Sequence, residues 1–125
     1  MRVLICSLSI VVAATLAPMS ASWAHHSHGN YDRVEWTYLE GTVKQIHWMN
    51  PHSWVYLEVI DAEGKPTIWA LEGASVVTLR RNGWTADSIA VGDPIDVRCN
   101  PLKDGSKGCL LGFITTAGGA EKEFD

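Results

Sequence analysis

The sequence predicts an all-β domain that contains one short helix. Residues 53–60 alternate apolar and polar side chains, with Val55, Leu57 and Val59 on one face of a strand. Four further strand-like runs are separated by short segments rich in Gly, Pro and Asp, which favour turns. The helical pattern lies between the third and fourth runs. Because strand number and helix position agree with an OB-fold, we expect a small five-stranded OB-fold-like barrel, with an open β-sandwich as the alternative.

The individual elements have recognisable boundaries. Gly41 lies inside the first expected strand, where it favours a bulge or a tight bend. Ser75 is placed to cap the helix, which runs to about Arg81, and Gly83 is placed to end it. The five expected strands cover residues 39–46, 53–60, 67–71, 95–99 and 109–116.

The first 24 residues are typical of a secretory signal peptide. Arg2 provides the positive end, residues 3–17 form the apolar run, and small residues precede a cleavage position after Ala24. The apolar run is shorter than the roughly 20 residues of a transmembrane helix, so an uncleaved anchor is the less favoured alternative. We therefore expect a periplasmic or secreted protein with no transmembrane segment after processing.

The mature chain, of roughly 100 residues, suits a single domain. We expect a His-rich N-terminal arm at residues 25–37, a barrel domain at 38–117 and a flexible C-terminal tail at 118–125. Loss of the single positive charge of Arg2 changes the formal net charge from −4 to −5. This acidic charge argues against nucleic acid as a partner, because nucleic-acid binding rewards clustered Lys and Arg.

Two cysteines remain after processing, Cys99 and Cys109, on either side of a loop that contains Asp104. In an antiparallel pair of strands, the residue numbers of any two facing residues add up to the same sum. A hairpin centred on Asp104 gives a sum of 208, and 99 plus 109 is also 208, so the two cysteines are expected to face each other. In an oxidising compartment this predicts a disulfide, worth about 2.5–3 kcal/mol for a loop of this size. A zinc site is the less favoured alternative, because two thiols without a neighbouring His or Cys are few ligands.

All five histidines lie before residue 53. Cleavage would start the mature chain at His25, whose free amine and imidazole can chelate one metal ion. His47 and His52 flank an Asn-Pro turn, which we expect to hold them close together. These nitrogens suit copper(II), nickel(II) and zinc(II), with affinity highest for copper. The candidate metal ligands are the histidines and one thioether that suits copper(I): His25, His26, His28, His47, His52 and Met49.

Two copper geometries and one simpler arrangement remain open. His25 with an imidazole from His47 or His52 gives a three-nitrogen set of the histidine-brace type. Alternatively, His26 binds copper(II) in the N-terminal tail together with the terminal amine and the intervening amide nitrogen. The commonest N-terminal copper motif is absent, because it has histidine at the third position of the mature chain, which is Ser27 here. In the simpler arrangement the histidines hydrogen-bond across the turn or lie in a solvated tail, and a methionine fills a packing gap.

The favoured function is an exported carrier or accessory protein for a metal, copper first, with zinc or nickel as alternatives. Hydrolysis is not indicated, because Glu58, Glu72 and Asp96 form no recognisable acid pair and no serine or cysteine nucleophile motif is present. A redox enzyme that uses the histidine brace is a less favoured alternative, because it would also need an open coordination position and a substrate face. The alternative function is a metal-free periplasmic module in which Trp48 and Trp54 stack on a cell-envelope or small organic ligand. A periplasmic protein partner is compatible with either role.

Short motifs are spread over nearly the whole mature chain: Ala24-His25-His26-Ser27, Gly41-Thr42-Val43, Asn50-Pro51-His52-Ser53-Trp54, Trp69-Ala70-Leu71-Glu72-Gly73, Leu79-Arg80-Arg81-Asn82-Gly83-Trp84 and Gly92-Asp93. Together they resemble a family of small exported bacterial proteins of unknown function. The resemblance implies export and a small β domain, and it names no catalytic residue. The cysteine pair is not general to that pattern, so the resemblance gives Cys99 and Cys109 no essential role.

Overall fold

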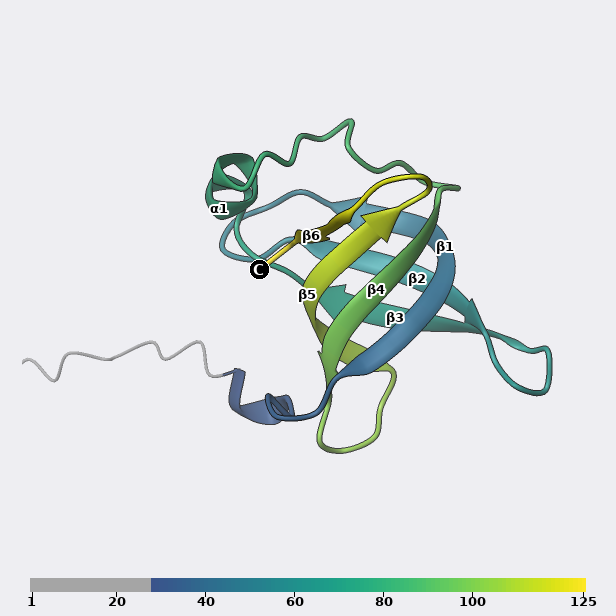
Figure 1. The fold of residues 1–125 in the computed structure, drawn as a ribbon. Helices are drawn as coiled ribbons and strands as arrows, with labels where there is room; N and C mark the ends of the chain where they lie inside the picture. The colour runs from purple at the N-terminus through teal and green to yellow at the C-terminus, as the bar shows by residue number, and fades with distance from the viewer. Residues whose placement is uncertain (1–27) are drawn as a thin grey trace, which may run out of the picture.

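The computed structural model describes residues 28–125, so the expected signal peptide and the candidate ligands His25 and His26 lie outside the described residues. Figure 1 shows a barrel with one helix beside it. Its elements in chain order are η1 (His28–Asn30), β1 (Thr37–His47), β2 (Trp54–Ile60), β3 (Pro66–Glu72), α1 (Val76–Arg81), β4 (Pro94–Pro101), β5 (Gly108–Thr116) and β6 (Glu121–Glu123).

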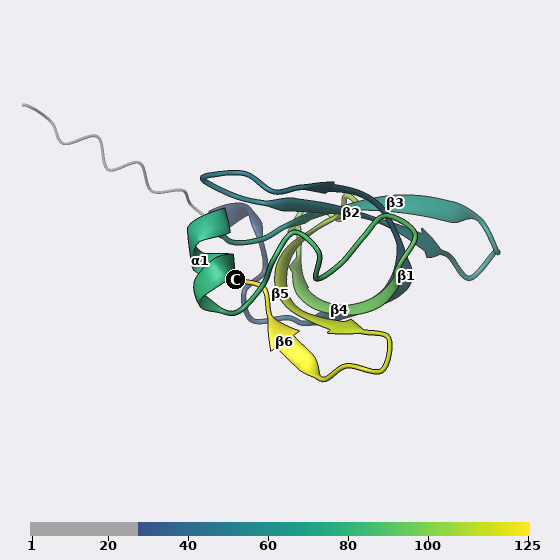
Figure 2. The ribbon, with the colours of Figure 1, turned by 90° about the horizontal axis from the view of Figure 1, so that it is seen from above.

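The strands form one sheet that closes on itself. Their order is β3-β2-β1-β4-β5-β6, and every neighbouring pair in this order is antiparallel. A parallel pairing of β3 with β5 closes the first five strands into a barrel, which Figure 2 shows from above. The predicted five-stranded barrel with one helix between its third and fourth strands is therefore confirmed, and the open sandwich is not the architecture.

The long strand β1 belongs to two sides of the barrel. Its first half, from Thr37 to Thr42, pairs with β4, and its second half, from Thr42 to His47, pairs with β2. A Cβ atom at Gly41 would lie 2.4 Å from the carbonyl oxygen of Glu58, so only glycine permits this close approach. The register shift of β1 lies later, between residues 43 and 45, so the bulge expected at Gly41 is displaced toward the end of the strand.

Apolar side chains from the strands fill the barrel interior. The alternation predicted for β2 is observed, since Val55 and Leu57 are fully buried. Ser75 caps α1 by accepting a hydrogen bond from the backbone N–H of Thr78, as predicted, and Leu79 of this helix joins the core. The strand residues that are fully buried are Val43, Val55, Leu57, Leu71, Cys99, Cys109, Leu111 and Ile114.

The C-terminal segment, expected to be a flexible tail, is packed against the barrel. β6 pairs with β5, and the side chain of Phe124 is fully buried. The backbone N–H of Phe124 donates to Gly112, and the Trp84 indole N–H donates to the carbonyl of Glu123. Polar composition suggested a tail, but burial of one aromatic side chain is enough to order this short segment.

The disulfide between Cys99 and Cys109 is confirmed, with the two Cα atoms 5.6 Å apart. The predicted strand register is wrong. Cys99 pairs with Leu111 and Cys109 pairs with Pro101, so the residue numbers of facing residues add up to 210. The cysteines therefore lie diagonally across the hairpin. A shift of two in the sum keeps each side chain on its original face, so both sulfurs still meet inside the barrel.

Candidate metal centre

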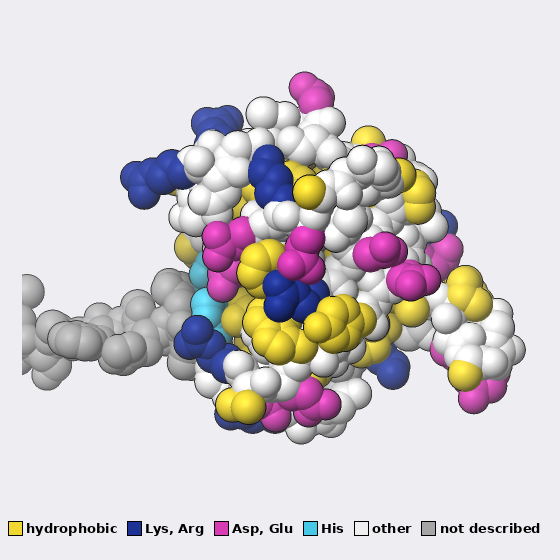
Figure 3. Space-filling view, in the orientation of Figure 1, with side chains coloured by type: hydrophobic (Ala, Val, Ile, Leu, Met, Phe, Trp, Pro, Cys, Tyr) yellow, Lys and Arg dark blue, Asp and Glu magenta, His cyan; other side chains and the backbone are white. Residues whose placement is uncertain are grey.

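Three side chains from separate segments meet where β2 begins and β3 ends. His28 is the first residue of η1, His52 lies in the connection between β1 and β2, and Glu72 is the last residue of β3. One candidate ligand atom from each lies within 4.8 Å of the other two. Figure 3 shows histidine side chains at the left edge of the molecule. The fold thus brings together groups that are up to 44 positions apart, from residue 28 to residue 72.

The N-terminal segment is attached to the hairpin between β4 and β5. Tyr31 forms an isolated antiparallel bridge with Leu102, and the backbone N–H of Asp32 donates to the carbonyl of Pro101 at 2.8 Å. Lys103 contributes two further bonds, from its backbone N–H to Asn30 and from its Nζ to the carbonyl of Gly29. These contacts hold η1, and therefore His28, against the barrel.

The connection that carries His52 is attached to the segment after β3. Ser53, which is fully buried, donates its backbone N–H to Ala74 and accepts from the backbone N–H of Gly73. The Asn50 side-chain oxygen accepts a hydrogen bond from the backbone N–H of Val76. His52 is therefore positioned by bonds to the residues that directly follow Glu72 in the chain.

The Glu72 carboxylate lies between a histidine and a tyrosine. Its Oε1 is 2.5 Å from Nδ1 of His52, and its Oε2 accepts a hydrogen bond of 2.6 Å from the hydroxyl of Tyr31. The His28 and His52 rings lie 5.8 Å apart between centroids. The side chains of His52 and Glu72 are only 23% and 12% exposed, so these polar contacts form in a partly dehydrated environment.

Tyr31 stays protonated over a wide pH range. Its residue is 8% exposed, and burial raises the pKa of its hydroxyl, as do the hydrogen bond to Glu72 and the charge of that carboxylate. A neutral phenol is a hydrogen-bond donor, which the carboxylate requires. Tyr31 therefore fixes one oxygen of Glu72 while the other faces His52.

Two imidazoles and one carboxylate are a familiar ligand set for divalent transition metals. Zinc accepts His₂Glu sets that leave a fourth position open, and copper(II) and nickel(II) also bind imidazole nitrogen. Ligand atoms lie about 2.0–2.2 Å from such an ion, so atoms up to 4.8 Å apart must close slightly around it. A side-chain carboxylate bonded to a histidine Nδ1 is also the usual way of orienting a metal-binding imidazole.

The sequence of residues 12–111 matches a family described as a family of unknown function, DUF6152. The chain belongs to this family. No curated protein and no solved structure matches it. The DUF6152 match spans His28, His52 and Glu72, so the whole three-residue group lies in the part of the chain that defines membership.

The structure does not bring every predicted ligand of this DUF6152 protein into the group. His47 lies at the end of β1, where its Nε2 is 2.5 Å from the amide nitrogen of Gln45 and its ring packs edge-on against Tyr56. Met49 is 45% exposed. The expected pairing of His47 with His52 is thus replaced, among residues 28–125, by a pairing of His52 with His28.

The two tryptophans proposed for ligand stacking have different surroundings. Trp48 packs against Phe124, at 5.9 Å between ring centroids, and lines a cavity of about 50 Å³ beside α1. This cavity is far smaller than the roughly 300 Å³ or more of a small-molecule site. Trp54 is half-buried at the start of β2, where it faces Glu72 across the β2–β3 pair. Trp48 therefore lies partly buried against the core, and Trp54 borders the three-residue group.

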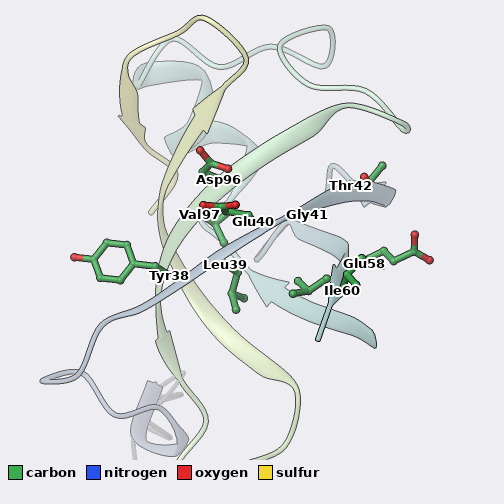
Figure 4. Close-up of a pocket in the computed structure, with 10 residues that line it drawn as sticks. Tyr38, Leu39, Glu40, Gly41, Thr42, Glu58, Ile60, Asp96 and Val97 are labelled. Carbon is green, nitrogen blue, oxygen red and sulfur yellow. The ribbon is translucent and has the colours of Figure 1, made fainter. Parts of the chain in front are cut away.

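A larger groove of about 620 Å³ lies along β1, β2 and β4 (Figure 4). Glu40 and Asp96 face each other across the β1–β4 pair, and Glu58 from β2 also lines the groove. None of the three candidate metal ligands belongs to it. The groove is an acidic surface feature separate from the candidate metal centre.

Sequence reasoning missed Glu72 and Tyr31 as members of the site. A signal for Glu72 was present in the sequence. In a β2–β3 hairpin centred on Glu63, the residue numbers of facing residues add up to 126, so Glu72 faces Trp54, which is two residues from His52. No comparable signal exists for Tyr31, since its position depends on the bridge to Leu102.

The described part of the chain has features that bear on location. No helix within residues 28–125 has both the length and the apolar character needed to cross a bilayer. The Cys99–Cys109 disulfide is typical of proteins in oxidising compartments outside the cytoplasm.

Proposed function

We propose that this protein is an exported carrier or accessory protein that binds a divalent transition metal through His28, His52 and Glu72. The observation that supports the proposal is the convergence of two imidazoles and one carboxylate from three segments, each held by its own backbone hydrogen bonds. Functional sites require ligands that are positioned in advance by the surrounding structure, and these contacts position all three side chains. Export follows from the signal-peptide pattern and agrees with the disulfide.

Copper(II) is the metal we favour, with zinc and nickel as alternatives. Affinity for sites of nitrogen and oxygen donors rises along the first-row divalent series to copper. Cys99 and Cys109 are held in a disulfide and Met49 is outside the group, so the proposed set contains no sulfur that would favour copper(I). The carboxylate of Glu72 also favours the divalent ion, because it supplies a hard anionic donor.

A carrier role agrees with the position of the centre. Its ligands come from a short N-terminal segment, a connection and a strand end, and the His52 side chain keeps 23% exposure. Such a centre can pass its metal to a partner by exchanging ligands one at a time.

The proposal is tested by metal analysis of protein purified from the periplasm and by titration with copper(II), zinc(II) and nickel(II). The informative variant is the double substitution His28→Ala/His52→Ala, with His47→Ala as the matched control at a histidine outside the group. We expect the double variant to lose bound metal and the control to keep it. Equal metal content in all three proteins would exclude this centre, provided that their thermal unfolding midpoints agree.

A further inference from the structure

We propose that the groove along β1, β2 and β4 is a docking site for an extended, positively charged segment of a partner protein, which adds a strand to the edge of β1. All the residues that line this groove lie between residues 38 and 97, and none of them belongs to the candidate metal centre. The inference therefore goes beyond metal binding and does not depend on it.

The first half of β1 has an open backbone edge. The β1–β2 pairing stops at the pair Thr42 and Glu58, and residues 37–41 pair with β4 alone. Figures 1 and 2 show the far ends of β2 and β3 projecting beyond the barrel, away from this half of β1. Among residues 28–125, no strand covers residues 37–41 on the side opposite β4. We call this side the open edge of β1.

The backbone groups that reach the open edge can be identified from strand geometry. Successive residues of a strand direct their N–H and C=O groups to alternate edges. The backbone groups of Val43 bond to residues 92 and 93, which lie on the β4 side. The β1–β4 register runs without a shift, so the backbone groups of Tyr38 and Glu40 face the open edge. They offer the donors and acceptors that an added strand needs.

The charges beside the open edge select a basic partner. Glu40 and Asp96 face each other across the β1–β4 pair, and like charges in this position destabilise a sheet. Both are exposed, and neither forms an ion pair with any residue of the described chain. Glu58, by contrast, pairs with Lys44. A Lys or Arg side chain from a docked segment would relieve the repulsion between the two facing carboxylates.

The apolar part of the groove suits the other face of a strand. Leu39 and Val97 line its buried side, and Figure 4 shows Leu39 and Ile60 on opposite sides of the space between β1 and the end of β2. Ile60 is 60% exposed, which is unusual for a large aliphatic side chain. A strand that alternates basic and apolar residues would place its basic side chains beside Glu40 and its apolar side chains against Leu39 and Ile60.

A second copy of this chain is a poorer occupant than a basic partner. The chain carries a formal net charge of −4, so two copies repel each other on average. A metal ion is not the occupant either, because none of the acidic residues of the groove belongs to a group that could hold one. Charge complementarity therefore favours a basic segment of a different protein.

The experiment uses two labelled peptides as probes, Lys-Val-Lys-Val-Lys-Val-Lys and Glu-Val-Glu-Val-Glu-Val-Glu. Fluorescence anisotropy measures their binding to the protein purified from the periplasm. The informative variant is Glu40→Gln/Asp96→Asn. Its matched control is Glu63→Gln/Asp87→Asn, which removes two exposed carboxylates of the same types outside the groove. Because the informative variant relieves a repulsion, its thermal unfolding midpoint should not fall.

We expect the lysine peptide to bind about tenfold or more tightly than the glutamate peptide. Its affinity should fall about fivefold or more in Glu40→Gln/Asp96→Asn and by less than about twofold in the control. Equal affinity for the two peptides, or equal affinity in the two variants, overturns the inference. A dimer of the native protein in analytical ultracentrifugation that Glu40→Gln/Asp96→Asn changes would assign the groove to a second copy and also overturn it.

Hydrogen exchange measured by NMR distinguishes strand addition from simple charge attraction. When the lysine peptide is bound, the backbone amides of Tyr38 and Glu40 should exchange about tenfold or more slowly, because they become hydrogen-bonded. Unchanged exchange at both amides would show ion pairing alone and overturn strand addition.

The variant His28→Ala/His52→Ala separates this inference from the proposed function. We expect it to bind the lysine peptide as tightly as the native protein, because the metal centre lies outside the groove. Loss of peptide binding in this variant would place the peptide at the metal centre and contradict the inference.

Discussion

His47 and His52 lie five residues apart in the chain and have different surroundings in the fold. His47 ends β1, where Gln45 and Tyr56 are its partners. His52 contacts the Glu72 carboxylate and lies beside the ring of His28, so its partners come from segments distant in sequence. A histidine on a strand has neighbours set by strand pairing, whereas one in a connection can be turned toward a third segment.

The difference shows that closeness in sequence is a poor guide to a shared site. The β1–β2 ladder ends at the pair His47 and Trp54, and the residues between them follow a path fixed by bonds to the segment after β3. That path aligns His52 with Glu72. Variants of the two regions test this contrast.

The two histidines should differ most in metal binding. His52→Ala is expected to lower copper(II) affinity by about 100-fold or more, because even partners outside the ligand shell are worth 10–100-fold. His47→Ala should change it by less than about threefold, since this side chain lies outside the group. Isothermal titration calorimetry of the two variants measures both effects. Equal losses would show that both histidines bind the ion.

Two glutamates, Glu72 in the three-residue group and Glu58 outside it, allow a second comparison of copper(II) affinity. Glu72→Gln should weaken copper(II) binding about 10–100-fold, because it removes the charge that binds the ion or orients His52. Glu58→Gln is the control, since Glu58 lies outside the group and forms an ion pair with the exposed Lys44 at 3.2 Å. Competition with a chromogenic chelator measures the two affinities. A weak effect of Glu72→Gln would assign this residue to structure alone.

The tyrosines beside each histidine should differ in their contribution to stability. Tyr31→Phe removes the donor to Glu72 and should lower the free energy of unfolding by about 1–3 kcal/mol, since the carboxylate oxygen is left unpaired. Tyr56→Phe keeps the ring that packs against His47 and should change it by less than about 0.5 kcal/mol. Urea unfolding measures both. A neutral Tyr31→Phe would show that water replaces the hydroxyl.

The raised pKa of Tyr31 predicts a loss of stability in alkali. Because the folded-state pKa lies above its ordinary value of about 10, the contribution of neutral Tyr31 is complete below pH 10 and declines as the pH rises further. Unfolding midpoints between about pH 8 and about pH 11 should therefore fall less steeply for Tyr31→Phe than for the native protein. Parallel curves would contradict the assignment.

The barrel was predictable because its signals are local. The alternation of residues 53–60, the cap at Ser75 and the turn residues between strands each act within a few positions of the chain. The disulfide was also accessible, although its register was wrong by two in the index sum. A shift of two leaves both cysteine side chains on the predicted face of the sheet, so the predicted disulfide was still correct.

The ordered C-terminus was not predictable from composition. Residues 118–125 are mostly small or charged, and the segment is held by Phe124, whose ring lies 5.0 Å from that of Trp84 between centroids. Whether one aromatic residue orders a polar segment depends on whether a cavity of its shape exists. Only the packing of Trp48, Trp84 and Gly73 around Phe124 answers that question.

The type of fold, the order of the strands along the chain, the helix cap and the cysteine pair could all be predicted from the amino-acid sequence, because hydrophobic alternation and turn chemistry act over short distances. It also supplied an unusual concentration of imidazoles near one end. Only the tertiary structure decided which imidazole meets which carboxylate, since β3 must return beside β2 and the N-terminal segment must pair with a distant hairpin. The candidate metal centre is a product of those long-range contacts, and the linear spacing of histidines does not encode it.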